Sequence, residues 1–239
     1  MGEAKIVKPT FVIAISGGVL WLMLASLAAQ EQQSAKLENV LKKMDDAAAH
    51  FQTARADFVF DQYQKVVAET DTQTGTVYYR KSGQEIEMMA EFKEPDRKFV
   101  LYKDGKLQVY QPKIEQVMEY SAGANREQLE SFLVLGFGGS GQDLNKRFDV
   151  SYQGEEKIDN VPTAVLQLIP KDAKTLSNFP QIILWIGLDN GISVQQKLIQ
   201  TQGDYRLAKY SAINLKTKIG SDVFRLKTTG KTKFVSPRG

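Results

Sequence analysis

The sequence has no cysteine and only one histidine, His50. Without cysteine the chain can form no disulfide, no thiol nucleophile and no cysteine-based zinc site, and it offers no thiol for lipidation. A serine–histidine–acid triad would have to use His50, and the chain contains no nucleophile-elbow motif to accompany it. We therefore interpret His50 as a surface histidine and expect no enzymatic activity.

The sequence also shows no recognisable pattern of metal ligands and no carboxylate pair suited to acid–base catalysis. Asp45 and Asp46 are adjacent on a predicted helix and cannot face each other. Glu85, Glu87 and Glu91 alternate with apolar residues, which is typical of the solvated face of a strand. Because no calcium-loop pattern is present either, we expect neither a metal ion nor a cofactor.

The chain has little excess charge, with 31 Lys and Arg against 28 Asp and Glu. This balance argues against nucleic acid as the main partner. No low-complexity segment or Pro/Ser-rich linker divides the 239 residues, which favours one domain with a core large enough to be stable without disulfides.

The N-terminus predicts export. Lys5 and Lys8 precede an uncharged apolar run, Phe11–Ala29, that ends in small residues. This order is typical of a secretory signal peptide, so we expect residues 1–29 to be cleaved and residues 30–239 to act in the periplasm. An N-terminal anchor in the inner membrane is the alternative, because the run is long enough to span a bilayer.

After the N-terminus, one helix is followed by many strands. The segment from Ser34, a candidate N-cap, to Phe51 has an apolar stripe at helical spacing. The period then changes to two, with tight turns such as Asp104-Gly105, and residues 223–227 are expected to form a late short strand. We predict an α+β fold with about eleven antiparallel strands and two or three helices.

Residues 136–141 read GFGGSG and match the dinucleotide-binding pattern G-x-G-x-x-G. In a nucleotide site this loop follows a strand and opens a long helix. Here a helical pattern at residues 124–136 comes before it and only a short turn follows, so we reject the nucleotide interpretation.

A sheet of about eleven strands must curl or close, and its apolar face needs a cover. Because the chain provides few helices, we expect a curved sheet around a loosely filled apolar interior, which is the arrangement of a ligand cavity.

Several stretches resemble the outer-membrane lipoprotein carrier family, which is LolA-like. They include FQTARADFVFDQ, TQTGTVYYRKSGQEIEM and FLVLGFGGSGQDLNKRFDV, and the hairpin of Asp104-Gly105-Lys106 with Tyr110 and Pro112 is the most specific. The resemblance covers roughly residues 33–235. It implies a single unclosed antiparallel half-barrel covered by a helical lid.

The resemblance also implies a function. Such proteins take acylated lipoproteins from an inner-membrane ABC transporter, shield the acyl chains and pass them to an outer-membrane lipoprotein receptor. We expect a monomer that carries lipoproteins or another lipid. A lipid-sensing envelope-stress regulator of the same fold is the alternative, and a hydrolase of envelope lipids is a more remote one.

Site residues follow from the resemblance. In the family an arginine latches the lid. Here the matching position is Lys81, with Arg80 beside it, and lysine lacks the guanidinium fork. Gly136, Gly138, Gly139 and Gly141 are expected to form a lid hinge. The expected cavity residues are Val77, Tyr79, Ile86, Met88, Leu129, Phe132 and Leu133.

The C-terminal region is basic. Residues 216–239 contain seven Lys or Arg and one acid, Asp222. Such a stretch is typical of a solvated edge and tail, and contact with anionic lipid headgroups or an acidic partner is the alternative.

Overall fold

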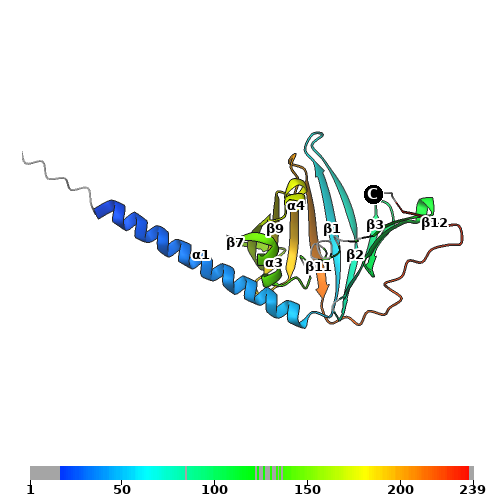
Figure 1. The fold of residues 1–239 in the computed structure, drawn as a ribbon, viewed down its shortest axis with the longest axis horizontal. Coiled ribbons are helices and arrows are strands. Elements are labelled where there is room, and N and C mark those ends of the chain that lie inside the picture. The colour runs from blue at the N-terminus through cyan, green and yellow to red at the C-terminus, as the bar shows by residue number, and fades with distance from the viewer. Residues whose placement is uncertain are drawn as a thin grey trace, which may run out of the picture.

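The computed structural model contains one curved sheet of twelve strands that does not close on itself (Figure 1). The order of the strands is β12-β6-β5-β4-β3-β2-β1-β11-β10-β9-β8-β7. Neighbouring strands are antiparallel except for β12 and β6, which are parallel. The fold class expected from the sequence is confirmed. The structure describes residues 17–83, 85–121, 123, 126, 130, 133, 135 and 137–236, with side chains from residue 30 onward.

The described elements follow one another as a helix, six strands, a short helix, two strands, another short helix and four strands, with a 3-10 turn before the sixth strand. The helical elements are α1 (Gly17–His50), the 3-10 turn η1 (Pro112–Ile114), α3 (Gly141–Arg147) and α4 (Ala173–Asn178). The first strands are β1 (Thr53–Gln64), β2 (Glu69–Ser82), β3 (Glu85–Glu94), β4 (Lys98–Lys103), β5 (Lys106–Gln111) and β6 (Gln116–Ser121). The remaining strands are β7 (Phe148–Ile158), β8 (Val161–Pro170), β9 (Gln181–Gly187), β10 (Ser193–Ile199), β11 (Tyr205–Asn214) and β12 (Lys233–Val235).

Turn chemistry fixes the register of the meander. Asp104 and Gly105 both have positive φ, 52° and 71°, as a two-residue hairpin turn of this kind requires. The turn pairs Lys103 with Lys106, so Tyr102 faces Leu107 and Val100 faces Val109. The hairpin predicted from the sequence is therefore present.

The helix α1 is longer than predicted and projects from the sheet (Figure 1). Ser34 lies inside it, so the prediction that Ser34 caps the helix is wrong. The residues around Ser34 are mostly alanine, leucine, glutamine, glutamate and lysine, which sustain a helix without a cap. Among the residues that the structure describes, no helix has the length and apolar character needed to cross a membrane.

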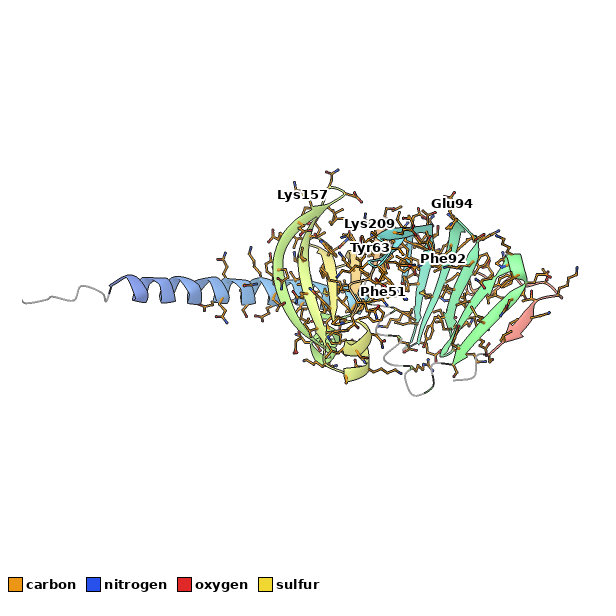
Figure 2. All side chains as sticks on the ribbon, turned by 90° about the horizontal axis from the view of Figure 1, so that it is seen from above. Phe51, Tyr63, Phe92, Glu94, Lys157 and Lys209 are labelled. Carbon is orange, nitrogen blue, oxygen red and sulfur yellow. The ribbon has the colours of Figure 1, made fainter. Side chains whose placement is uncertain are left out.

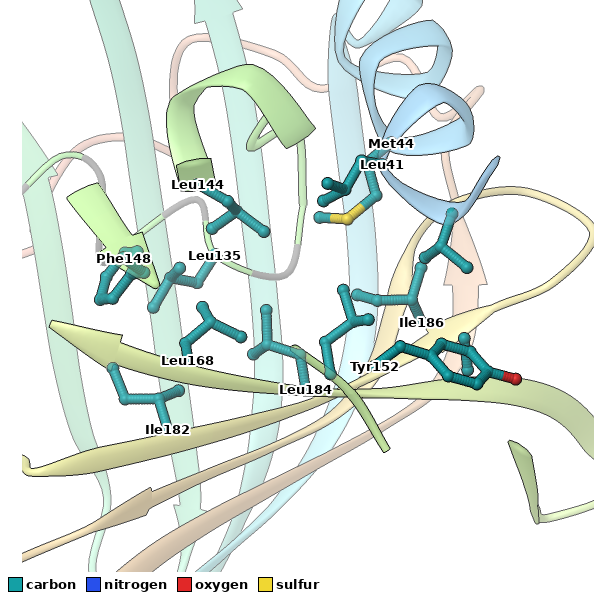
Figure 3. Packing of buried hydrophobic residues seen from close by; sticks show 13 residues of the cluster. Leu41, Met44, Leu135, Leu144, Phe148, Tyr152, Leu168, Ile182, Leu184 and Ile186 are labelled. Carbon is teal, nitrogen blue, oxygen red and sulfur yellow. The ribbon is translucent and has the colours of Figure 1, made fainter. Parts of the chain in front are cut away.

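One half of the concave face is filled by the chain itself. Leu41 and Met44 of α1, with Leu144 of α3, pack onto the inward residues of β7, β8 and β9 (Figure 3). Leu166, Leu168, Ile182 and Leu184 are fully buried there. Seen from above, the two halves of the sheet stand on either side of Phe51, the residue that follows α1 (Figure 2).

A C-terminal strap, residues 215–232, crosses the convex face and leads to β12 (Figure 1). Phe224 of this strap is 2% exposed and packs on Met89 and Leu101. The prediction of a strand at residues 223–227 is wrong, because this segment forms turns that insert Phe224 against the sheet. The short parallel strand β12 was not predicted.

Candidate functional site

The other half of the concave face contains an apolar cavity of about 220 Å³. Strands β1–β4 form one side of the cavity and β10–β11 form the other side. All the lining side chains are apolar or aromatic except Gln196. The lining residues are Phe58, Phe60, Val77, Tyr79, Met88, Ala90, Phe92, Val100, Gln196, Leu198, Ala208 and Tyr210.

Strand alternation places these residues in the cavity. Phe58 and Phe60 are two apart on β1, so both face inward. Antiparallel pairing sets Phe58 opposite Tyr210 and Phe60 opposite Ala208 on β11. Phe58 and Phe92 meet edge to face at 5.0 Å between ring centroids. The wall is therefore a set of matched cross-strand pairs.

Phe137 packs against two of the residues that line the cavity. Its side chain is fully buried, and its ring stacks on Tyr79 at 5.2 Å and meets Tyr210 edge-on at 4.8 Å. Burial raises the pKa of both tyrosine hydroxyls above the ordinary value, so both remain neutral. Phe137 comes from the loop that precedes α3.

The glycines around Phe137 allow the loop to approach α1 closely. Gly138 has a φ of +92°, and a Cβ there would lie 2.6 Å from the ring of Phe51. A Cβ at Gly141 would lie 2.5 Å from the carbonyl oxygen of Leu41. Gly139 is half-buried, and Gly136 lies outside the described residues. These contacts explain the glycines at 138 and 141, and the hinge stays a prediction.

The segment expected to form the lid is described in part. Leu129 and Phe132 lie outside the described residues. Leu133 packs on the cluster that surrounds the cavity, as does Ile86. The other expected cavity residues, Val77, Tyr79 and Met88, lie in the lining given above.

A polar network ties this segment to the sheet. The hydroxyl of Tyr102 on β4 donates to Glu130 Oε1 at 2.6 Å. Arg126 binds the same carboxylate at 2.8 Å and Glu85 on β3 at 3.0 Å. These contacts connect the expected lid with two neighbouring strands, and the sequence analysis did not identify them.

Arg80 and Lys81 lie on opposite faces of β2. The Arg80 guanidinium binds Glu87 Oε2 at 2.5 Å on the convex face and stacks over the ring of Phe224 at 4.7 Å. Lys81 shares the inward face with Val77 and Tyr79, and its side chain is exposed at the end of the strand. The arginine therefore holds the C-terminal strap, and the latch role of Lys81 stays a prediction.

The single histidine lies away from the cavity. His50 Nδ1 is 2.7 Å from the carbonyl oxygen of Asp46, one turn earlier in α1, and the side chain is exposed. A surface hollow beside it is lined by both charged and apolar residues, and no serine or threonine is among its described lining residues, which are Lys43, Asp46, Ala47, His50, Phe51, Asp189, Asn190, Leu215 and Lys216. Within the described part of the chain, no three His, Cys, Asp or Glu side chains gather as metal ligands.

Sequence reasoning missed most of the aromatic lining and also Phe137. The signal was present in both cases. The alternation in DFVFDQ places Phe58 and Phe60 on one face, and Phe137 is the only aromatic residue within GFGGSG. A large apolar side chain inside a glycine-rich loop is a candidate for insertion into a core.

Comparisons with known proteins show the family and the fold. A protein-family model described as "-like: Uncharacterized protein" matches residues 84–232, and no curated protein matches the chain. The structure of MucB is similar at 16% identity and a TM-score of 0.52, over 80% of this chain and 63% of MucB. An uncharacterized conserved protein from Thermus thermophilus is similar at 12% identity and a TM-score of 0.54, over 85% of this chain and 99% of that one. A LolA superfamily protein from Nitrosomonas europaea matches at 14% identity and a TM-score of 0.40, over 79% and 97% of the two chains.

Proposed function

The chain belongs to the family described as "-like: Uncharacterized protein" and has a LolA-like fold, and from its cavity we propose that it is a non-enzymatic periplasmic carrier of acyl chains. In this proposal residues 1–29 are a cleaved signal peptide and residues 30–239 are the carrier domain, which acts as a monomer. The carrier receives acylated lipoproteins or another lipid from an inner-membrane ABC transporter and delivers them to an outer-membrane lipoprotein receptor.

The apolar cavity on the concave face is the observation that carries this proposal. Burying a methylene group gains about 0.8 kcal/mol, so ten methylenes would gain about 8 kcal/mol. A free energy of that size corresponds to a micromolar complex, before the cost of ordering the ligand. Even a partly buried acyl chain would therefore be held without any chemical step.

The cavity must enlarge to accept such a chain. Its 220 Å³ lies below the range of about 300–1,000 Å³ that is usual for ligand pockets. Phe137 packs on the lining residues Tyr79 and Tyr210, and we infer that its ring limits the cavity at this end. We propose that an entering acyl chain displaces Phe137 together with the segment tied down by Glu130 and Arg126, and that their return expels the chain.

A pair of tryptophan substitutions on one strand tests the proposal. Ala208 lines the cavity, whereas Lys209 is exposed on the opposite face of β11. Ala208→Trp would fill the space that an acyl chain needs, and Lys209→Trp would leave it open. Each purified full-length protein is presented with a detergent-solubilised diacylated lipoprotein, and native mass spectrometry measures the captured fraction.

We expect capture by the wild type and by Lys209→Trp, and a loss of at least tenfold for Ala208→Trp. Matching thermal transitions would show that the variants are folded. Equal capture by the two tryptophan variants, or capture by none of the three proteins, would contradict an acyl-chain site on the concave face.

A second candidate function is a lipid-sensing regulator that uses the same cavity. A groove of about 380 Å³ beneath the C-terminal strap supports it, because a regulator needs a second binding surface for its protein partner and we propose this groove for that role. Phe99 and Tyr110 contribute to its floor, and Arg225 and Lys227 to its rim. A carrier would pass captured lipid to acceptor membranes, whereas a sensor would retain it and bind a membrane signalling protein. A transfer assay followed by a pull-down separates the two functions.

A further inference from the structure

A lysine lies beside the cavity, next to two of the residues that line it. Lys98 is the first residue of β4 and pairs with Phe92 of β3, two positions before Val100. Both Phe92 and Val100 line the cavity. The Lys98 ammonium lies 4.2 Å from the centre of the Phe92 ring, so the charged group sits directly over an aromatic wall residue.

The surroundings of Lys98 leave its charge only partly compensated. The ammonium donates to Gln73 Oε1 at 2.7 Å, and Gln73 in turn donates to Asp71 at 2.9 Å. In the described part of the chain no carboxylate lies within ion-pair distance of Lys98. An ammonium has three donors, so two remain for a ligand. Burial lowers the pKa of the half-buried Lys98, and Asp71 opposes this change.

A second cation, on β11, lies near the same end of the cavity from its other side. Arg206 of β11 pairs with Gln62 and Leu198. It lies two residues from the cavity residue Ala208, on the same face of the strand. Its guanidinium lies 6.0 Å from the ring of Phe179, and no ion pair to it is formed within the residues that the structure describes. This edge of the apolar cavity, its rim, therefore carries two cations, Lys98 and Arg206, with Asp71 as the nearby acid.

From this arrangement we propose that the cavity takes an amphiphile with one acyl chain and an anionic head, a carboxylate or a phosphate monoester, whose oxygens accept hydrogen bonds from Lys98. The inference rests on the proposed acyl-chain function and specifies the class of ligand. The chain fills the aromatic wall region, and the head stays at the rim, where it replaces the water that Lys98 has lost. Hydrogen bonds to charged groups are the stronger kind, so the head contributes to selection among lipids.

The test compares three ligands with the same chain and different heads. Dodecanoic acid, dodecyl phosphate and dodecanol, each below its aggregation limit, compete with an uncharged fluorescent apolar dye bound to the purified full-length protein. The proteins compared are the wild type, Lys98→Met, Lys98→Arg and Lys93→Met. Lys93 is the matched control because its ammonium contacts Thr76 on the convex face of the neighbouring strand.

We expect the wild type to bind at least one anionic ligand roughly tenfold tighter than dodecanol, as one charge-assisted hydrogen bond supplies. Lys98→Met should abolish this preference, and Lys98→Arg and Lys93→Met should keep it. The better of the two anions identifies the head. Equal binding of all three ligands, or a preference that survives Lys98→Met, overturns the inference and leaves the acyl-chain site standing. Binding of none of the three overturns the proposed function and the inference together.

Discussion

Phe137 offers a direct test of how the cavity works, through the substitution Phe137→Ala. The side chain is fully buried between Tyr79 and Tyr210. Replacing a buried phenylalanine with alanine costs about 3–5 kcal/mol in a close-packed core. We expect a value near the lower end, because the ring packs on Tyr79 and Tyr210, which border the cavity and can relax toward the gap.

The same substitution should change which ligands bind. Removing the ring lengthens the cavity beyond Tyr79, so an acyl chain can bury further methylenes. Each one gains about 0.8 kcal/mol, which is about a fourfold increase in affinity. In the wild type the affinity should stop rising at a certain chain length, and in Phe137→Ala it should continue to rise for longer chains.

The measurements are urea unfolding and a series of saturated fatty acids of increasing length, bound by wild-type and variant protein. Phe224→Ala is the control, because Phe224 is equally buried but lies on the convex face. The control should lose a similar amount of stability with no change in the chain-length limit. If Phe137→Ala shows the same limit as the wild type, Phe137 does not close the cavity and the reasoning is refuted.

Two further predictions concern stability. Burial opposes ionisation of Glu87, but the hydrogen bonds from Lys103 and Arg80 outweigh it and hold the pKa of Glu87 below its ordinary value. This stabilisation is present above the ordinary pKa and is lost as pH falls through the folded-state pKa. Glu87→Gln should therefore lower the urea midpoint at pH 7, and the difference from the wild type should shrink as the pH is lowered through the folded-state pKa. Gly138→Ala should destabilise the protein by more than about 1 kcal/mol, because φ is +92° and the new methyl group meets Phe51. The control is Gly230→Ala, where the methyl group would point into open space, and it should leave the thermal unfolding temperature unchanged.

The strands were the part of the fold that the sequence predicted well. Alternation in QEIEMMAEF places Met88, Ala90 and Phe92 on one face, and the structure has them side by side in the cavity wall. Turn residues with positive φ, such as Asp104-Gly105, set the register. Both signals are local, and an antiparallel meander is built from local pairings.

Features that depend on distant residues were not predictable in the same way. The strand β12 has three residues and exists because Phe234 pairs with Val117, more than a hundred positions earlier. Arg80 lies beside the expected latch position. Its contact with Phe224 of the strap shows that its side chain lies on the convex face, and this contact joins residues far apart in the sequence. Phe137 lies within a motif whose glycines indicate loop flexibility, whereas its burial depends on contacts with the distant residues Tyr79 and Tyr210.

The uneven filling of the concave face has a consequence for how the sheet moves. The side formed by β7, β8 and β9 is braced by α1 and α3, whereas the side formed by β1 to β4 borders empty space. Resistance to local opening rises with the density of buried contacts, so we expect the side formed by β7, β8 and β9 to be the stiffer one. Under the proposed function, a guest molecule would enter by flexing the other side alone, and the braced side would keep the protein folded during entry.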